Sequence, residues 1–140
     1  MSGTGDSRRG ALRIREAVLL AVLALCGCAR DRIHVSPVSL DLDAKNPGKL
    51  ICIVENPRVV VSDFLGSYRA ALEDRGYKVN VVKGNPQASA CPLTTRYVAY
   101  ANGFARLEVY WEGIPAGMAA HSAAANSEDA LKQIVNRLLP

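Results

Sequence analysis

The sequence has few of the residues and motifs that enzyme and metal sites need. Its 140 residues include only two histidines, His34 and His121, and only 6% are aromatic. Two isolated histidines do not make the three- or four-ligand sets of metal sites, so a surface or packing role is expected for each. The Gly-x-Ser-x-Gly turn of serine hydrolases and a glycine-rich phosphate loop are also missing. We therefore expect a protein without metal or cofactor that is not an enzyme.

The sequence also has no large excess of charge of either sign. The net charge is +4, from 17 basic and 13 acidic residues, and residues 1–27 carry two of the four excess positive charges. This balance is too weak to indicate a nucleic-acid partner. A composition of 49% hydrophobic and 21% charged residues excludes collagen-like, coiled-coil and largely disordered chains. The length fits one domain.

The N-terminal apolar run is too short for a transmembrane helix. It covers the nine residues Ala17–Leu25 and follows a basic segment that ends at Arg15 and Glu16. A helix needs about 20 apolar residues to cross the hydrocarbon layer. A short apolar run behind basic residues is typical of an export signal, which we predict over residues 1–27. The alternative is a soluble protein with an apolar N-terminal helix.

The residues that end this run resemble the lipobox of bacterial lipoproteins. In Leu25-Cys26-Gly27-Cys28, leucine stands three positions and a small residue one position before a cysteine. The resemblance implies that the Cys28 thiol receives a diacylglycerol and that the new amino terminus is then acylated. Ala29, in place of aspartate after Cys28, favours the periplasmic face of the outer membrane. Such an anchor holds a protein on a bilayer without any spanning segment.

Two cysteines remain once Cys26 leaves with the signal and Cys28 is lipidated. Export places Cys52 and Cys91 in an oxidising compartment, where a pair of cysteines usually forms a disulfide. A metal site would need more ligands, and a redox pair would have its cysteines two residues apart. We therefore expect a structural Cys52–Cys91 bridge.

The first half of the exported chain divides into a tether and the start of a domain. Polar, proline and glycine residues predict a tether over residues 28–48, with a short strand at Ile33–Val38 left open. The domain follows over 49–140. A buried strand is expected at Lys49–Val54, a helix from Ser62 or Asp63 to Gly76, and a second strand at Tyr77–Lys83. A crossover of this length predicts that the two strands are parallel.

The second half predicts a β-hairpin and a final helix. Asn102-Gly103 is typical of a two-residue turn, which would pair Ala99 with Arg106 and Tyr97 with Glu108. A short edge strand is expected at Ala116–Ala123, and Ser127 is expected to cap the last helix. The order β-α-β-β-β-α predicts an α+β two-layer sandwich, with one mixed sheet and two helices on one face.

The outer face of the predicted hairpin is the candidate interaction surface. Aromatic residues mixed with arginine on an exposed sheet are enriched at protein interfaces. The alternative is that the tyrosines are ordinary half-buried strand residues covered by residues 33–42. The residues assigned to this face are Thr95, Tyr97, Phe104, Arg106, Glu108 and Tyr110.

Several short stretches resemble a known family. Cys52-Ile53-Val54-Glu55-Asn56-Pro57, followed by Cys91-Pro92 and then by Tyr97 and Ala99, is similar to the Sbal-type family of small proteobacterial lipoproteins. The likeness covers roughly residues 49–111. It implies a lipid-anchored envelope protein that keeps the two cysteines, and the role of the family is unknown.

Together these features predict a lipid-anchored envelope lipoprotein whose domain binds an unknown envelope protein. The second hypothesis is a periplasmic binder of a small ligand or lipid. That ligand would occupy a cleft between the sheet and the helices near Trp111.

Overall fold

The computed structural model describes residues 32–61, 63–87, 90–122 and 128–140. The predicted signal peptide and Cys28 lie outside the described residues. The helices and strands follow one another as β1 (Arg32–Ser36), α2 (Leu42–Lys45), β2 (Leu50–Val54), α3 (Phe64–Asp74), β3 (Lys78–Val82), β4 (Leu93–Ala99), β5 (Phe104–Trp111), β6 (Ile114–Ser122) and α4 (Glu128–Leu138).

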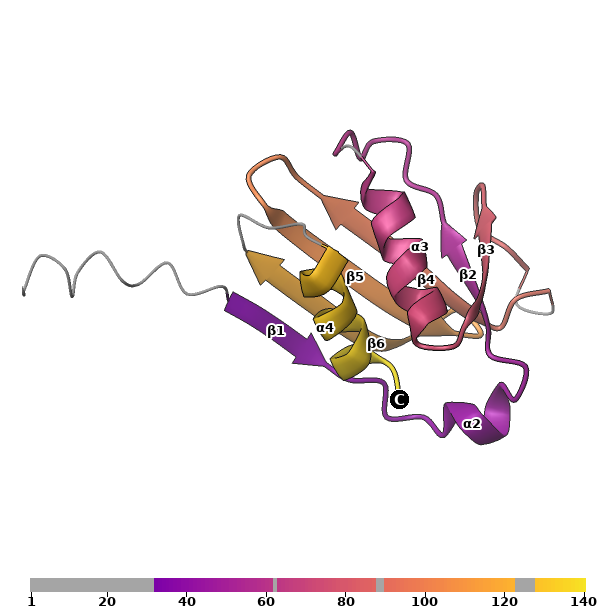
Figure 1. The fold of residues 1–140 in the computed structure, drawn as a ribbon. Helices are drawn as coiled ribbons and strands as arrows, with labels where there is room; N and C mark the ends of the chain where they lie inside the picture. The colour runs from indigo at the N-terminus through magenta and orange to yellow at the C-terminus, as the bar shows by residue number, and fades with distance from the viewer. Residues whose placement is uncertain (1–31, 62, 88–89, 123–127) are drawn as a thin grey trace, which may run out of the picture. The chain divides into compact units, whose positions relative to one another are not determined.

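The architecture is a two-layer α+β sandwich. Six strands form one mixed sheet in the order β1-β6-β5-β4-β2-β3, and the helices α3 and α4 lie on the same face of it (Figure 1). The predicted fold class is confirmed, although the predicted order contained four strands. The expected edge strand at Ala116–Ala123 is longer as β6, and it is internal because β1 pairs with it.

The β2-α3-β3 unit forms because each of its elements buries a continuous apolar surface. Ile51 and Ile53 on β2 are fully buried, and Tyr68 and Leu72 of α3 are buried as well. β2 pairs in parallel with β3 and also with β4, which confirms the parallel crossover predicted from the sequence. Gly76 follows α3 with a φ of +94°, a conformation that glycine adopts without strain.

The start of α3 differs from the prediction. Ser62 lies outside the described residues. Asp63 occupies the N-cap position, but it has a left-handed backbone with a φ of 58°, and its side chain makes no capping hydrogen bond. The side-chain cap predicted for Asp63 is therefore wrong, because a capping side chain normally extends from a β-region backbone.

The tether predicted over residues 28–48 is wrong for its described part. β1 pairs antiparallel with β6 from Arg32 onward, and Val38 and Leu42 are buried in the core. The Val38 amide donates to the Leu138 carbonyl at 2.9 Å, which joins this segment to the end of α4. The domain therefore begins at residue 32 and not at residue 49. The apolar residues that hold this segment in the core are separated by polar ones, so the sequence shows no clear strand or helix periodicity here.

The close fit of this segment depends on a glycine in β6. A Cβ atom on Gly117 would lie 2.7 Å from Cγ2 of Val38 and 3.1 Å from the carbonyl oxygen of Ser36. Both distances are shorter than ordinary contacts, so a side chain at this position would push the segment away from β6.

The β4–β5 hairpin is shifted by one residue from the predicted register. Ala99 pairs with Ala105, and Tyr97 pairs with Leu107. The loop has three residues, because the Tyr100 amide donates to the Phe104 carbonyl and the Gly103 amide donates to the Tyr100 carbonyl. With φ at +91°, Gly103 fits a type I turn followed by a bulge, which is the usual three-residue hairpin. Relative to β5, a shift by one residue moves each side chain of β4 to the opposite face of the sheet from the one predicted.

Candidate functional site

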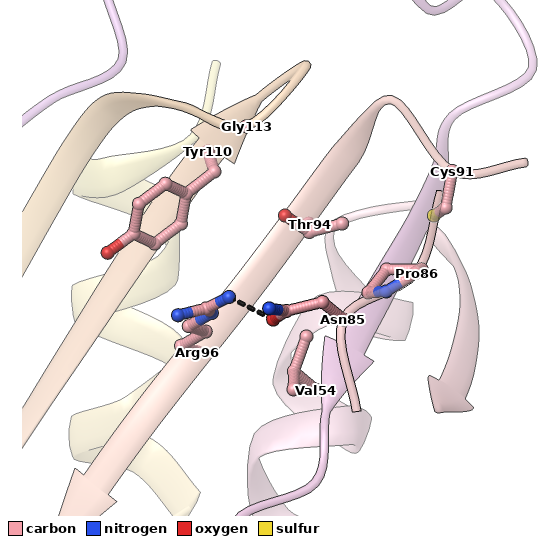
Figure 2. Close-up of a pocket in the computed structure, with 8 residues that line it drawn as sticks. All are labelled: Val54, Asn85, Pro86, Cys91, Thr94, Arg96, Tyr110 and Gly113. Atoms are coloured by element: carbon pink, nitrogen blue, oxygen red, sulfur yellow. Dashed lines mark hydrogen bonds between the residues drawn. The ribbon is translucent and has the colours of Figure 1, made fainter. Parts of the chain in front are cut away.

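The candidate site lies on the sheet face opposite α3 and α4, which we call the open face. Successive side chains of a strand point to opposite faces, so the burial pattern assigns each residue of the central strands. In Figure 2 the side chains of Thr94, Arg96 and Tyr110 project from their strands on the side away from the helices. The open-face residues of the central strands are Phe104, Arg106, Glu108 and Tyr110 of β5, Thr94, Arg96 and Val98 of β4, and Cys52 and Val54 of β2.

Arg96 stands at the centre of this face. Its guanidinium donates a hydrogen bond to the Asn85 side-chain oxygen, and its Cζ lies 5.3 Å from the centroid of the Tyr110 ring (Figure 2). A guanidinium at this distance from an aromatic ring is held by a cation–π attraction. The Arg96 side chain remains exposed. It is therefore positioned on two sides and still free to meet an incoming group.

Glu108 connects Tyr110 to a second arginine. The Tyr110 hydroxyl donates to Oε2 of Glu108 at 2.8 Å, and Nε of Arg106 lies 3.0 Å from Oε1. The hydrogen bond to Glu108, helped by desolvation, raises the pKa of Tyr110 above its ordinary value. Tyr110 therefore stays protonated as a donor. One carboxylate between two guanidinium groups leaves this cluster with an excess positive charge.

A hollow beside Arg96 opens onto the same face. Its volume is about 320 Å³, at the lower end of the range of small-molecule sites. Two further hollows of about 140 and 450 Å³ also include Arg96 in their walls. The first hollow is lined by Val54, Asn85, Pro86, Cys91, Thr94, Arg96, Tyr110 and Gly113.

The Cys52–Cys91 disulfide borders this region, and Cys91 lines the first hollow. The bridge is present, with the two Cα atoms 6.2 Å apart, which confirms the pairing predicted from the sequence. It ties the loop that follows β3 to the buried strand β2. Asn85 belongs to the same loop. The bridge therefore helps to hold Asn85, which accepts a hydrogen bond from Arg96, close to that arginine.

Four of the six residues predicted on this surface share the open face, and Tyr97 and Thr95 do not. Phe104, Arg106, Glu108 and Tyr110 lie together on β5. Tyr97 is 5% exposed and faces the helices, so its assignment to the surface is wrong.

Tyr97 belongs to the aromatic core. Its ring stacks on Phe64 at 5.4 Å and meets Tyr68 edge-on at 6.1 Å. Thr95 faces the same way, and its hydroxyl lies 2.5 Å from the hydroxyl of Tyr68. Both errors follow from the one-residue shift of the hairpin, since the helix-facing residues of β4 are the odd-numbered ones.

The residues that the sequence reading missed are Arg96 and Asn85. The predicted register puts Tyr97 on the outer face and therefore its neighbour Arg96 on the face toward the helices. The observed register instead pairs Arg96 with Glu108 on the open face. Asn85 lies in the loop after β3, and only the fold brings it to β4. A three-residue loop ending at Gly103, had it been predicted, would have placed Arg96 on the open face. No signal in the sequence pointed to Asn85.

The two histidines contribute no metal site to the described part of the chain. His34 is exposed on β1, and His121 is buried on β6. No group of three histidine, cysteine or carboxylate side chains comes together among the described residues. In those same ranges, none of the helices combines the length and apolarity needed to cross a membrane.

Trp111 does not line the hollows described at Arg96. It is half-buried against the core, and Nζ of Lys45 lies 6.0 Å from the centroid of its ring. Its alternation with Val109 places it on the helix side of the sheet. The hollows at Arg96 open on the opposite side, so they are distinct from the cleft expected near Trp111.

Comparison of the chain with models of protein families, with curated proteins and with solved structures finds no match.

Proposed function

We propose that this chain is a lipid-anchored lipoprotein of the bacterial cell envelope, held on the periplasmic face of the outer membrane. The support comes from the short apolar run behind basic residues and from Leu25-Cys26-Gly27-Cys28 with Ala29 after it. The Cys52–Cys91 bridge is consistent with an oxidising compartment. The likeness to the Sbal-type lipoprotein family agrees with this proposal and stays a prediction.

The domain acts in this proposal as a non-enzymatic module that binds an envelope protein through its open face. The observation that carries the proposal is the arginine–tyrosine cluster, in which Arg96 and Arg106 flank Tyr110 and Glu108. Arginine and tyrosine are enriched where partners bind, and a guanidinium fork matches a carboxylate. The excess positive charge favours a partner with an acidic segment.

The anchor is tested by mass spectrometry of the protein from its native host. The expected product begins at Cys28 and carries the mass of the added acyl chains. A Cys28→Ala variant is expected to leave the membrane fraction and to keep its fold, judged by the intact disulfide. An unmodified Cys28 in membrane-bound wild type would contradict this part of the proposal.

The interaction surface is tested by photo-crosslinking in intact cells. A photo-reactive residue at Val98, which pairs with Arg106 and lies two residues from Arg96 on the open face, is expected to capture a defined partner. The charge reversal Arg96→Glu should abolish this product, and the matched reversal Arg69→Glu on α3 should leave it unchanged. Capture that persists in Arg96→Glu would contradict the role of the open face.

A small anionic ligand in the hollow beside Arg96 is the second candidate. The hollow has a size that such ligands occupy, and Thr94 and Asn85 supply polar groups next to the guanidinium. Short dicarboxylic acids would then raise the melting temperature of wild type and not that of an Arg96→Ala variant. An equal shift in both proteins would remove this candidate.

A further inference from the structure

An aromatic pair, exposed Tyr100 and half-buried Phe104, lies at the tip of the β4–β5 hairpin. Tyr100 is 56% exposed, and its ring centroid lies 5.9 Å from that of Phe104. Three hydrogen bonds fix the tip, including one from the Phe104 amide to the Asn102 side-chain oxygen at 3.1 Å. The pair is therefore held on a defined turn and is not covered by the core.

The sheet register places this pair beside the start of the domain. Phe104 pairs with Ser122, and Ser122 pairs on its other side with Arg32, the first residue of β1. Neighbouring strands lie about 4.8 Å apart, so the Cα atoms of Arg32 and Phe104 are separated by roughly 10 Å. The hairpin tip and the start of β1 thus belong to the same end of the sheet.

The chain between this end and the proposed anchor is short. Only residues 29–31 separate Cys28 from Arg32. Four Cα–Cα steps of an extended chain span at most about 14 Å. Acyl chains on Cys28 would therefore hold this end of the sheet next to the lipid headgroups, and a long tether is excluded because β1 begins at residue 32.

We propose that the Tyr100–Phe104 hairpin tip contacts the interfacial layer of the membrane that carries the anchor. This inference rests on the proposed lipidation of Cys28. Tyrosine side chains favour the membrane–water interface, where the ring is apolar and the hydroxyl stays hydrated. Arg32, exposed at the same end, adds an attraction for anionic headgroups. One lipid anchor and one aromatic tip would then fix the orientation of the domain on the bilayer.

Exposure alone does not single out this tip. Ile114, the first residue of β6, is 68% exposed at the opposite end of the sheet. β5 runs from Phe104 to Trp111, so the two ends are separated by roughly 24 Å at 3.4 Å per residue. Ile114 therefore provides a control that is apolar and at least as exposed as Tyr100 but remote from the anchor.

The test measures how close each end lies to lipid. The lipidated protein carries either Tyr100→Cys or Ile114→Cys, labelled with a fluorophore. Lipids on Cys28 and the Cys52–Cys91 bridge leave the introduced thiol as the single reactive one. The proteins are placed in vesicles of phosphatidylethanolamine and phosphatidylglycerol that contain lipids with a quencher near the headgroup. A several-fold larger loss of fluorescence at position 100 than at position 114 is expected.

Equal quenching at the two positions, or stronger quenching at position 114, would overturn the inference. Mass spectrometry of the same samples separates this outcome from a failure of the proposed function, because missing acyl chains on Cys28 would refute the anchor itself. A label at Ala101→Cys, which is also exposed at the tip, provides a second reading if the Tyr100 substitution disturbs the turn. It is expected to behave like the label at position 100.

Discussion

Removal of the Cys52–Cys91 bridge is expected to destabilise the domain strongly. The two cysteines are 39 residues apart, and closing a loop of this length restricts the unfolded chain. The chain-entropy relation gives a stabilisation of about 4 kcal/mol, an upper value when the unfolded chain keeps residual structure. A domain of this size has a total stability of about 5–15 kcal/mol. The double substitution Cys52→Ala/Cys91→Ala should therefore remove a large part of the stability.

The measurement is urea unfolding of the Cys28→Ala protein with and without the bridge. The midpoint should fall in the double variant, and the slope with urea should rise because the unlinked chain exposes more surface when unfolded. A reductant should lower the midpoint of the bridged protein and leave that of the double variant unchanged. The entropic reasoning would be refuted if the unfolding free energy fell by less than about 1 kcal/mol, or if reductant left the midpoint of the bridged protein unchanged.

Three further predictions concern the core and the β1–β6 junction. Tyr68→Phe should cost about 1–3 kcal/mol, because it leaves the buried Thr95 hydroxyl without its partner, and adding Thr95→Val should recover part of that loss in a urea-unfolding cycle. Gly117→Ala should cost about 1–3 kcal/mol by forcing its Cβ against Val38 and the Ser36 carbonyl, and a smaller loss in a Val38→Ala background would identify the clash. Stability should also fall as the pH rises above the ordinary tyrosine pKa of 10.0, because burial raises the pKa of Tyr68 and the folded state then holds this proton more tightly than the unfolded state. Unfolding curves at increasing pH measure this loss, and a Tyr68→Phe variant with the same alkaline loss as wild type would assign it to other groups.

The sequence predicted the elements that bury dense apolar surfaces. The β2-α3-β3 unit was identifiable because Ile51, Ile53 and the apolar face of α3 follow simple periods and end at turn residues. The sequence signal for β1 is weak, because Ile33 and Val35 alternate with polar residues and Pro37 and Gly48 follow. Pairing with β6, together with packing of Ile33 and Val35 against the core, makes this short alternation a stable strand.

Only part of the candidate site was predicted correctly, and the cause of the errors is the geometry of the hairpin. The composition of the hairpin correctly indicated a surface of aromatic and charged residues, and β5 supplies four of them. Asn102-Gly103 predicts a two-residue loop, whereas the loop has three residues, and this difference places Arg96 instead of Tyr97 on the open face. Asn85 reaches Arg96 from a distant loop, a juxtaposition that local sequence patterns do not contain.

The incorporation of β1 into the sheet decides how the fold responds to mechanical load. Tension applied to the chain ahead of Arg32 enters the domain at the Arg32–Ser122 pair and would open the β1–β6 ladder one pair at a time. Beyond the strand, Val38 is bonded to the carbonyl of Leu138 and seated over Gly117. Peeling would therefore stop at this junction, so that five residues could extend and re-form their ladder while the remaining five strands stay closed.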